Sequence, residues 1–199
     1  LRQRGKDHSI KLNYGALYGV VDKLAAAGLI EAVETVRQGR RPERTVYAIT
    51  DAGLAKHDGW LAELLRTPKR EFAAFEAGLA LAGGLAPDQV ASLLDERVVR
   101  LRVELASVEE SERIAQEMGV PEVFVVEAAY RLALLRAELT FTSELRDKIR
   151  DGTLGGLAGW RRLHELLDGG MSMEEIFRDP TKHLGEDGRV FLPQGQSSG

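Results

Sequence analysis

The sequence contains no cysteine, and it contains no long apolar run. The first absence excludes a disulfide framework and a thiolate metal site, and it is compatible with a reducing cytoplasm. The second excludes a spanning helix, which needs roughly 18 apolar residues, and the N-terminus shows no apolar core of a signal peptide. We therefore expect a cytoplasmic protein.

Residue groupings that are typical of enzymes are scarce as well. Gly83-Gly84 and Gly155-Gly156 lack the flanking strand and the Lys-Ser/Thr signature of a phosphate-binding loop, and carboxylate pairs such as Glu109-Glu110 are typical of solvated helix faces. The four histidines lie far apart, without the spacing of a metal site: His8, His57, His164 and His183. The sequence predicts that the protein is not an enzyme and that it binds neither a metal ion nor a cofactor.

The charge is unevenly distributed along the chain. The net charge is -4, yet residues 1–57 sum to +4 and the remaining residues therefore sum to -8. A basic segment followed by an acidic one suggests that the first part meets a polyanion and the second meets other protein.

A helix, a hairpin and a second helix follow one another near the N-terminus. Leu17, Val20, Val21 and Leu24 have helical spacing, which predicts a helix over residues 13–27, and Gly28 follows where a left-handed C-cap belongs. The β-rich runs 32–36 and 45–49 flank a polar loop that contains Gly and Pro, which predicts a β-hairpin. Thr50 is a natural N-cap for a further helix.

This order is that of the later part of a winged helix-turn-helix, in which one helix enters the major groove of DNA and the hairpin, or wing, contacts the backbone. We treat the start of the chain as truncated, because the earlier helices of the motif are not in the sequence. Four arginines at the hairpin tip would hold phosphates by displacing counterions, although an ordinary solvated turn is the alternative. They are Arg37, Arg40, Arg41 and Arg44.

The amino-acid sequence of this region resembles that of the PadR family of transcriptional regulators. The resemblance is carried by Leu12-Asn13-Tyr14-Gly15-Ala16-Leu17-Tyr18-Gly19, then by Gly28-Leu29-Ile30, and then by Tyr47-Ala48-Ile49-Thr50-Asp51-Ala52-Gly53. It covers about residues 11–54, and Tyr14 stands where the family usually has Pro.

The resemblance implies which residues face DNA. The start of the groove helix would contact base edges through Asn13, Tyr14, Ala16 and Tyr18, while Lys11 and Lys23 would join the wing arginines in holding phosphates. Tyr18 has the alternative of packing in the domain core, and Lys23 that of plain surface charge.

Two long helices dominate the second half of the sequence. Their predicted ranges are 87–118 and 121–150, and the second helix is apolar on nearly every side over 123–139, so a partner subunit is the natural source of its cover. The resemblance implies a C-terminal helical dimerisation domain; the alternative is a self-contained bundle in a monomer. The candidate dimer residues are Leu94, Val98, Leu101, Leu105, Phe124, Leu132, Leu135 and Leu139.

Shorter elements complete the prediction. Thr67 as N-cap and Pro68 at the first position predict a helix that runs to about Ala82, and Ser172 with Glu175 has the spacing of a capping box. We expect a loose tail from Pro180 onward. The predicted domains are a winged-helix domain at 1–66, a helical dimerisation domain at 67–152, and short helices with a flexible tail at 153–199.

The sequence thus predicts a mainly α-helical fold: an N-terminally truncated winged helix-turn-helix with a small hairpin wing, then an antiparallel helical dimerisation domain. The leading hypothesis is a homodimeric regulator, a repressor by the habit of the family, on a pseudo-palindromic promoter site of double-stranded DNA. A small aromatic effector would be held by Trp60, Phe124, Tyr130 and Phe141, with Trp160 as a further candidate, although aromatics at helical spacing are more often plain core. The alternatives are a protein-interaction module without specific DNA binding and a ligand-binding protein for which DNA is incidental.

Overall fold

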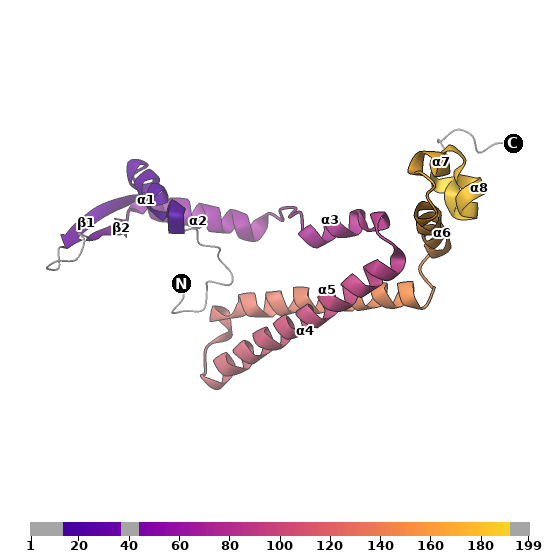
Figure 1. The fold of residues 1–199 in the computed structure, drawn as a ribbon. Coiled ribbons are helices and arrows are strands. Elements are labelled where there is room, and N and C mark those ends of the chain that lie inside the picture. Colours follow the sequence, from indigo (N-terminus) through magenta and orange to yellow (C-terminus); the bar gives the residue numbers. More distant parts are fainter. Residues whose placement is uncertain (1–13, 37–43, 192–199) are drawn as a thin grey trace. The chain divides into compact units, whose positions relative to one another are not determined.

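The computed structural model describes residues 14–36 and 44–191 of the chain, which divides into two compact units, residues 1–71 and residues 72–199 (Figure 1). The N-terminal unit contains a short 3-10 turn, η2 (Tyr14–Ala16), the helix α1 (Leu17–Ala26), the strands β1 (Ile30–Val36) and β2 (Arg44–Ile49), and the helix α2 (Asp51–Arg66). The strands form a two-stranded antiparallel sheet. The predicted order of helix, hairpin and helix is confirmed.

The C-terminal unit consists of helices alone. Its elements are α3 (Ala74–Ala80), η3 (Ala82–Gly84), α4 (Pro87–Glu117), η4 (Glu122–Phe124), α5 (Val126–Arg150), α6 (Leu157–Asp168), α7 (Met173–Arg178), α8 (Pro180–Leu184) and η5 (Gly185–Phe191). The long helices α4 and α5 lie side by side and antiparallel (Figure 1). Of the described helices, none is long and apolar enough to cross a membrane.

The core of this unit lies where the start of α4, the end of α5 and the start of α6 meet. Val90, Ala91 and Leu94 of α4 are buried against Ile149 of α5 and Leu157 of α6. These residues recur at helical spacing on α4, so one face of the helix is apolar and is removed from water. The hydrophobic effect therefore holds α4 and α5 together most strongly at this end of the two helices.

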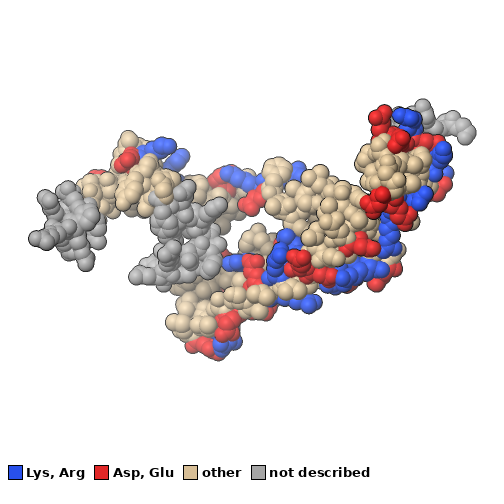
Figure 2. Space-filling model, viewed as in Figure 1, with Lys and Arg blue, Asp and Glu red and all other residues tan. Residues whose placement is uncertain are grey.

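Ion pairs connect the two long helices along their length. Arg131 pairs with Glu104 at 2.6 Å and Arg136 with Glu109 at 2.8 Å. Further pairs join Arg97 to Glu138, and both Arg146 and Arg150 to Asp95. Basic and acidic side chains are accordingly interspersed over the surface of α4 and α5 in Figure 2. These pairs fix the register of α4 against α5, although each exposed pair adds little to stability.

The predicted helix over residues 67–82 is wrong at its start. Thr67 ends α2 instead of beginning the next helix: its backbone is extended and its N–H donates to the carbonyl of Glu63 at 2.9 Å. Since the residue before a proline is biased away from the helical conformation, Pro68 keeps Thr67 extended. The next helix, α3, begins only at Ala74.

The expectation of a loose tail from Pro180 onward is also wrong for the described part. Leu184 of α8 is buried, and Gly188 of η5 lies so close to Pro180 that a Cβ atom there would stand 2.1 Å from the Pro180 carbonyl oxygen. The segment folds because these contacts bury it on α6 and α7. Residues 192–199 lie outside the described part of the chain.

The predicted capping box at Ser172 is confirmed. The Ser172 hydroxyl accepts from the backbone N–H of Glu175 at 3.2 Å, and the Glu175 carboxylate accepts from the backbone N–H of Ser172 at 2.8 Å. Hydrogen bonds from the backbone and hydroxyl of Ser172 hold the pKa of Glu175 below its ordinary value. The box thus begins α7 and fixes the direction in which the chain leaves the preceding loop.

Candidate nucleic-acid interface

A short set of hydrogen bonds holds α1, the hairpin and α2 together. Gly28 follows α1 with φ +67°, the left-handed conformation that the sequence predicted. The Thr50 hydroxyl donates to the Gly28 carbonyl at 2.7 Å and accepts from the Gly53 N–H at 3.1 Å. One threonine side chain therefore caps α2 and ties it to the end of α1.

Gly53 permits a very close approach at the same point. A Cβ atom on Gly53 would stand 2.0 Å from the Leu29 carbonyl oxygen, and that oxygen already accepts the N–H of Thr50 at 3.1 Å. Only a residue without a side chain fits there. The spacing Thr50-x-x-Gly53 thus has a mechanical role: it seats α2 against the turn that orients α1.

The strand register defines the two ends of the β-hairpin. Ile30 pairs with Ile49 at the end next to the helices, and Val36 pairs with Arg44 at the other end. Residues 37–43, which join these last partners, contain Arg37, Arg40 and Arg41; all three lie outside the described residues, as does the side chain of Arg44. In the sequence, the other wing arginines thus fall between Val36 and Arg44, the strand partners farthest from the Ile30–Ile49 pair.

Three of the predicted contact residues have described side chains, in η2 and α1, and all three are exposed to solvent. Tyr18 is 81% exposed, so it packs in no core formed by the described residues. Ala16 and Lys23 are exposed as well. Lys11 and Asn13 lie outside the described residues, and of Tyr14 only the backbone, in η2, is described.

The candidate dimer residues fall into two groups. Five of them are buried within a single chain, where α4 and α5 cover one another, and are therefore not available to a partner: Leu94, Val98, Leu101, Leu132 and Leu135. Leu105 and Leu139 are half-buried and Phe124 is exposed. The prediction that these five residues contact a second copy is therefore corrected. Helical spacing alone does not tell which apolar face of a helix is covered by the chain itself.

The four aromatic residues predicted to hold an effector belong to different units: Trp60 lies in the N-terminal unit, and Phe124, Tyr130 and Phe141 lie in the C-terminal unit. Trp60 lines a groove of the N-terminal unit with Leu24 and Ile49. Phe124 and Tyr130 lie near the start of α5, whereas Phe141 is 11 positions beyond Tyr130 on α5, or about 16 Å along the helix. Phe141 instead shares a cavity of about 310 Å³ with Trp160.

In the described ranges 14–36 and 44–191, no group of three or more His, Asp or Glu side chains is placed to hold a metal ion.

Comparison with known proteins identifies the N-terminal unit. Residues 1–58 match the family model described as the transcriptional regulator PadR-like family. The chain carries a PadR-like domain. The resemblance predicted over about residues 11–54 is thereby confirmed.

Solved structures extend the likeness beyond this domain. The crystal structure of Bacillus subtilis PadR in complex with operator DNA has a TM-score of 0.60 at 17% identity, over 70% of this chain and 81% of that chain. The Streptococcus mutans UA159 protein smu.1604c has a TM-score of 0.52 at 24% identity, over 71% and 83%. No curated protein sequence matches the chain. These likenesses show the fold, and the predicted PadR-like winged-helix fold with C-terminal helices is confirmed.

Proposed function

We propose that this protein is a sequence-specific DNA-binding transcriptional regulator. The observation that carries the proposal is the PadR-like domain, in which the Thr50 and Gly53 contacts seat an exposed α1 beside a hairpin with a basic loop. On this proposal α1 enters the major groove, with Tyr18 toward the bases and Lys23 toward phosphate. Support comes also from the B. subtilis PadR structure of similar fold, which is a complex with operator DNA.

The proposal includes a homodimer. Helix α5 carries exposed apolar residues at spacings of three and four, so that they form one stripe along the helix: Val126, Tyr130, Leu134, Ala137 and Phe141. The buried Leu132 and Leu135 fall between them, on the face toward α4. A second copy that covers this stripe would remove it from water, and two-fold symmetry would present two α1 helices to the halves of a pseudo-palindrome. Repression by occupancy of a promoter is part of the proposal.

Wing arginines provide the test of DNA binding. The variant with Arg40→Ala, Arg41→Ala and Arg44→Ala should bind promoter DNA at least about a hundredfold more weakly, because counterions stay on each phosphate that no arginine neutralises. The slope of log affinity against log salt should fall by about 1 for each phosphate that the variant leaves unbound. Quantitative mobility shift at several salt concentrations measures both quantities.

A charge-matched control accompanies this variant. Arg162, Arg178 and Arg189 are exposed in the C-terminal unit, each ion-paired with a glutamate within one turn, and their triple alanine variant should bind DNA like the native protein. Equal affinity and equal salt slope for the two triple variants would support a protein-interaction module without specific DNA binding.

The α5 stripe provides the test of the dimer. Leu134→Glu should raise the dissociation constant of the dimer by about a hundredfold or more, because it places an unpaired carboxylate in the proposed seam. Its monomer should still fold, since Leu134 is 52% exposed in a single chain. Met173→Glu, at an exposed site on α7, is the control, and sedimentation velocity reads both. A native protein that is monomeric at micromolar concentration would contradict the dimer.

A further inference from the structure

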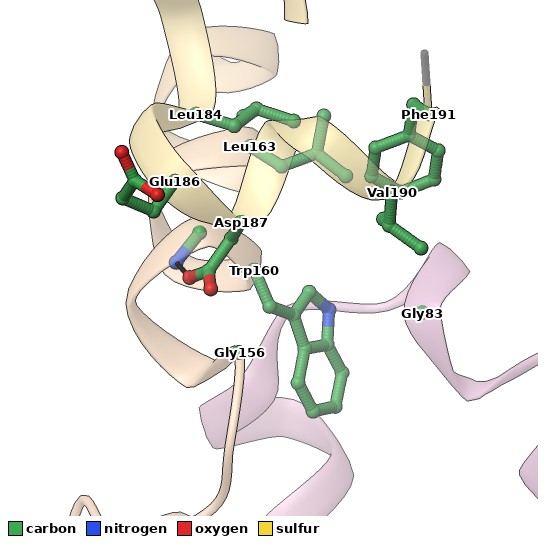
Figure 3. Close-up of a pocket in the computed structure, with 10 residues that line it drawn as sticks. Gly83, Gly156, Trp160, Leu163, Leu184, Glu186, Asp187, Val190 and Phe191 are labelled. Atoms are coloured by element: carbon green, nitrogen blue, oxygen red, sulfur yellow. Dashed lines mark hydrogen bonds between the residues drawn. The ribbon is translucent and has the colours of Figure 1, made fainter. Parts of the chain in front are cut away.

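A pocket in the C-terminal unit belongs to none of the surfaces described so far. It has a volume of about 520 Å³ and lies between η3, α6, α8 and η5. Apolar side chains form most of its wall, as Figure 3 shows: Trp160 and Leu163 of α6, Leu184 of α8, and Val190 and Phe191 of η5. Pockets of this size with mostly apolar walls and a few polar groups are typical of small-molecule sites.

The wall of this pocket is held in place by specific contacts. The Trp160 indole N–H donates to the Leu85 carbonyl at 2.9 Å, which fixes the plane of the ring. The Phe191 ring packs against the Phe177 ring of α7, with 4.8 Å between ring centroids and 60° between the ring planes. The pocket is thus largely pre-formed, so the side chains of its wall would lose little conformational entropy when a ligand binds.

Gly159 determines the position of the acidic side of the pocket. A Cβ atom on Gly159 would stand 2.5 Å from the Cβ atom of Asp187, so only glycine lets η5 approach α6 this closely. The backbone N–H of Gly159 then donates to one carboxylate oxygen of Asp187 at 2.8 Å. This bond orients the carboxylate at the pocket wall, on the side of Trp160 and Gly156 in Figure 3.

The pocket has charge of one sign only. Glu186 and Asp187 both line it, and none of the described residues in its wall is Lys, Arg or His. Glu186 is paired with Arg189 at 2.7 Å, whereas Asp187 forms no ion pair with any residue of the described chain. Residues 192–199 contain no Lys or Arg.

We infer that this pocket binds a hydrophobic organic cation. The apolar walls favour a lipophilic body, the Trp160 ring favours a positive charge over its face, and the Asp187 carboxylate attracts that charge at short range. This inference goes beyond regulation of transcription, because the site would bind its ligand whether or not the N-terminal unit binds DNA. If the protein is the proposed regulator, the pocket is also where a cationic effector would act.

Two ions of the same shape and opposite charge test the inference. Tetraphenylphosphonium and tetraphenylborate are titrated separately into the full chain without DNA, by calorimetry and by fluorescence of Trp160 in a Trp60→Phe background. The phosphonium should bind and quench Trp160, and the borate should bind at least about tenfold more weakly. Equal binding of both ions, or no binding of the phosphonium, overturns the inference.

Matched variants then locate the charge. Asp187→Asn keeps an oxygen that accepts from Gly159 and removes the charge, so it should weaken phosphonium binding about tenfold. Asp168→Asn, at the exposed end of α6 outside the pocket, should change binding less than twofold. Equal affinities of the two variants would show that Asp187 does not attract the ligand.

A substitution at the rim guards against a variant that fails to fold. Val190 is 78% exposed, so both Val190→Lys and Val190→Glu should be tolerated. Lys should weaken phosphonium binding and Glu should not, because only the sign of the added charge differs. The same direction of change in both variants overturns the charge argument. Mobility shifts with DNA are measured separately, so a failed DNA interaction and a failed ligand site give distinguishable results.

Discussion

In the N-terminal unit Gly53 is the one described residue that is buried, whereas the C-terminal unit holds all the buried apolar side chains of the described chain. The first unit is organised by the capping threonine, the left-handed Gly28 and the close approach at Leu29. The second is organised by side chains removed from water between α4, α5 and α6. The two units therefore depend on different kinds of interaction.

This difference explains why the family model matches the N-terminal unit, whereas the rest of the likeness to known proteins is found by comparing structures. Hydrogen bonds to backbone groups and close backbone contacts need particular residues at particular positions, so the 1–58 match lies in the N-terminal unit. A core needs only apolar side chains of suitable volume, and many sequences meet that condition. The likeness that extends beyond residues 1–58 is accordingly one of structure, at 17–24% identity.

The largest expected effect is on the C-terminal core. Leu94→Ala should lower the free energy of unfolding of this unit by about 3 kcal/mol, because Leu94 is only 4% exposed and its neighbours cannot close the cavity fully. Leu93→Ala is the control, since the adjacent Leu93 is 47% exposed. Denaturant unfolding followed by Trp160, which packs against this core, measures both changes. Equal destabilisation by the two variants would show that the assigned core face is wrong.

The next effect should be confined to the N-terminal unit. Gly53→Ala should destabilise it by about 2 kcal/mol, because the new methyl group meets the Leu29 carbonyl. Gly59→Ala on the same helix has no atom within 4 Å of the added Cβ atom and should stabilise α2 by about 0.5–1 kcal/mol. Fluorescence of Trp60 in a Trp160→Phe background reports the unfolding. The comparison fails if both alanines act alike.

The smallest effect sharpens the account of the C-terminal core. Thr142 is fully buried on α5, and its hydroxyl oxygen has no hydrogen-bond partner in the described chain. Thr142→Val removes this unsatisfied group at nearly the same shape, so the free energy of unfolding should rise by about 1 kcal/mol. Thr140→Val, at an exposed position of the same helix, should stay within about 0.5 kcal/mol. A destabilised Thr142→Val variant would indicate that the native hydroxyl does form a hydrogen bond.

Local signals in the sequence predicted much of the fold. The Gly28 turn, the Thr50 cap, the hairpin, the Ser172 capping box and the long helices α4 and α5 all follow from residues close together in the chain. Thr67-Pro68 was ambiguous, because a threonine before a proline can begin a helix or end one. The order of α8 and η5 could not be predicted, since it depends on contacts of Leu184 and Gly188 with distant residues.

The candidate sites divide in the same way. The exposure of Tyr18 fits the prediction for a groove helix, and the β-rich runs 32–36 and 45–49 predicted the hairpin that flanks the basic segment. Helical spacing did not separate the face that α4 covers from the exposed stripe of α5, because both are apolar. The C-terminal pocket was harder to predict. Gly159, Trp160 and the pair Glu186-Asp187 form one site only because η5 packs on α6, and no local sequence pattern indicates that packing.

The most direct test of the central claim is a mobility shift of the native protein on its own promoter region, at two salt concentrations, with an excess of unrelated competitor DNA. The account predicts a shift that weakens as salt rises and that survives the competitor, because phosphate contacts supply affinity while base contacts from α1 supply specificity. Absence of a shift at both salt concentrations, from protein shown to be folded and dimeric, would contradict it.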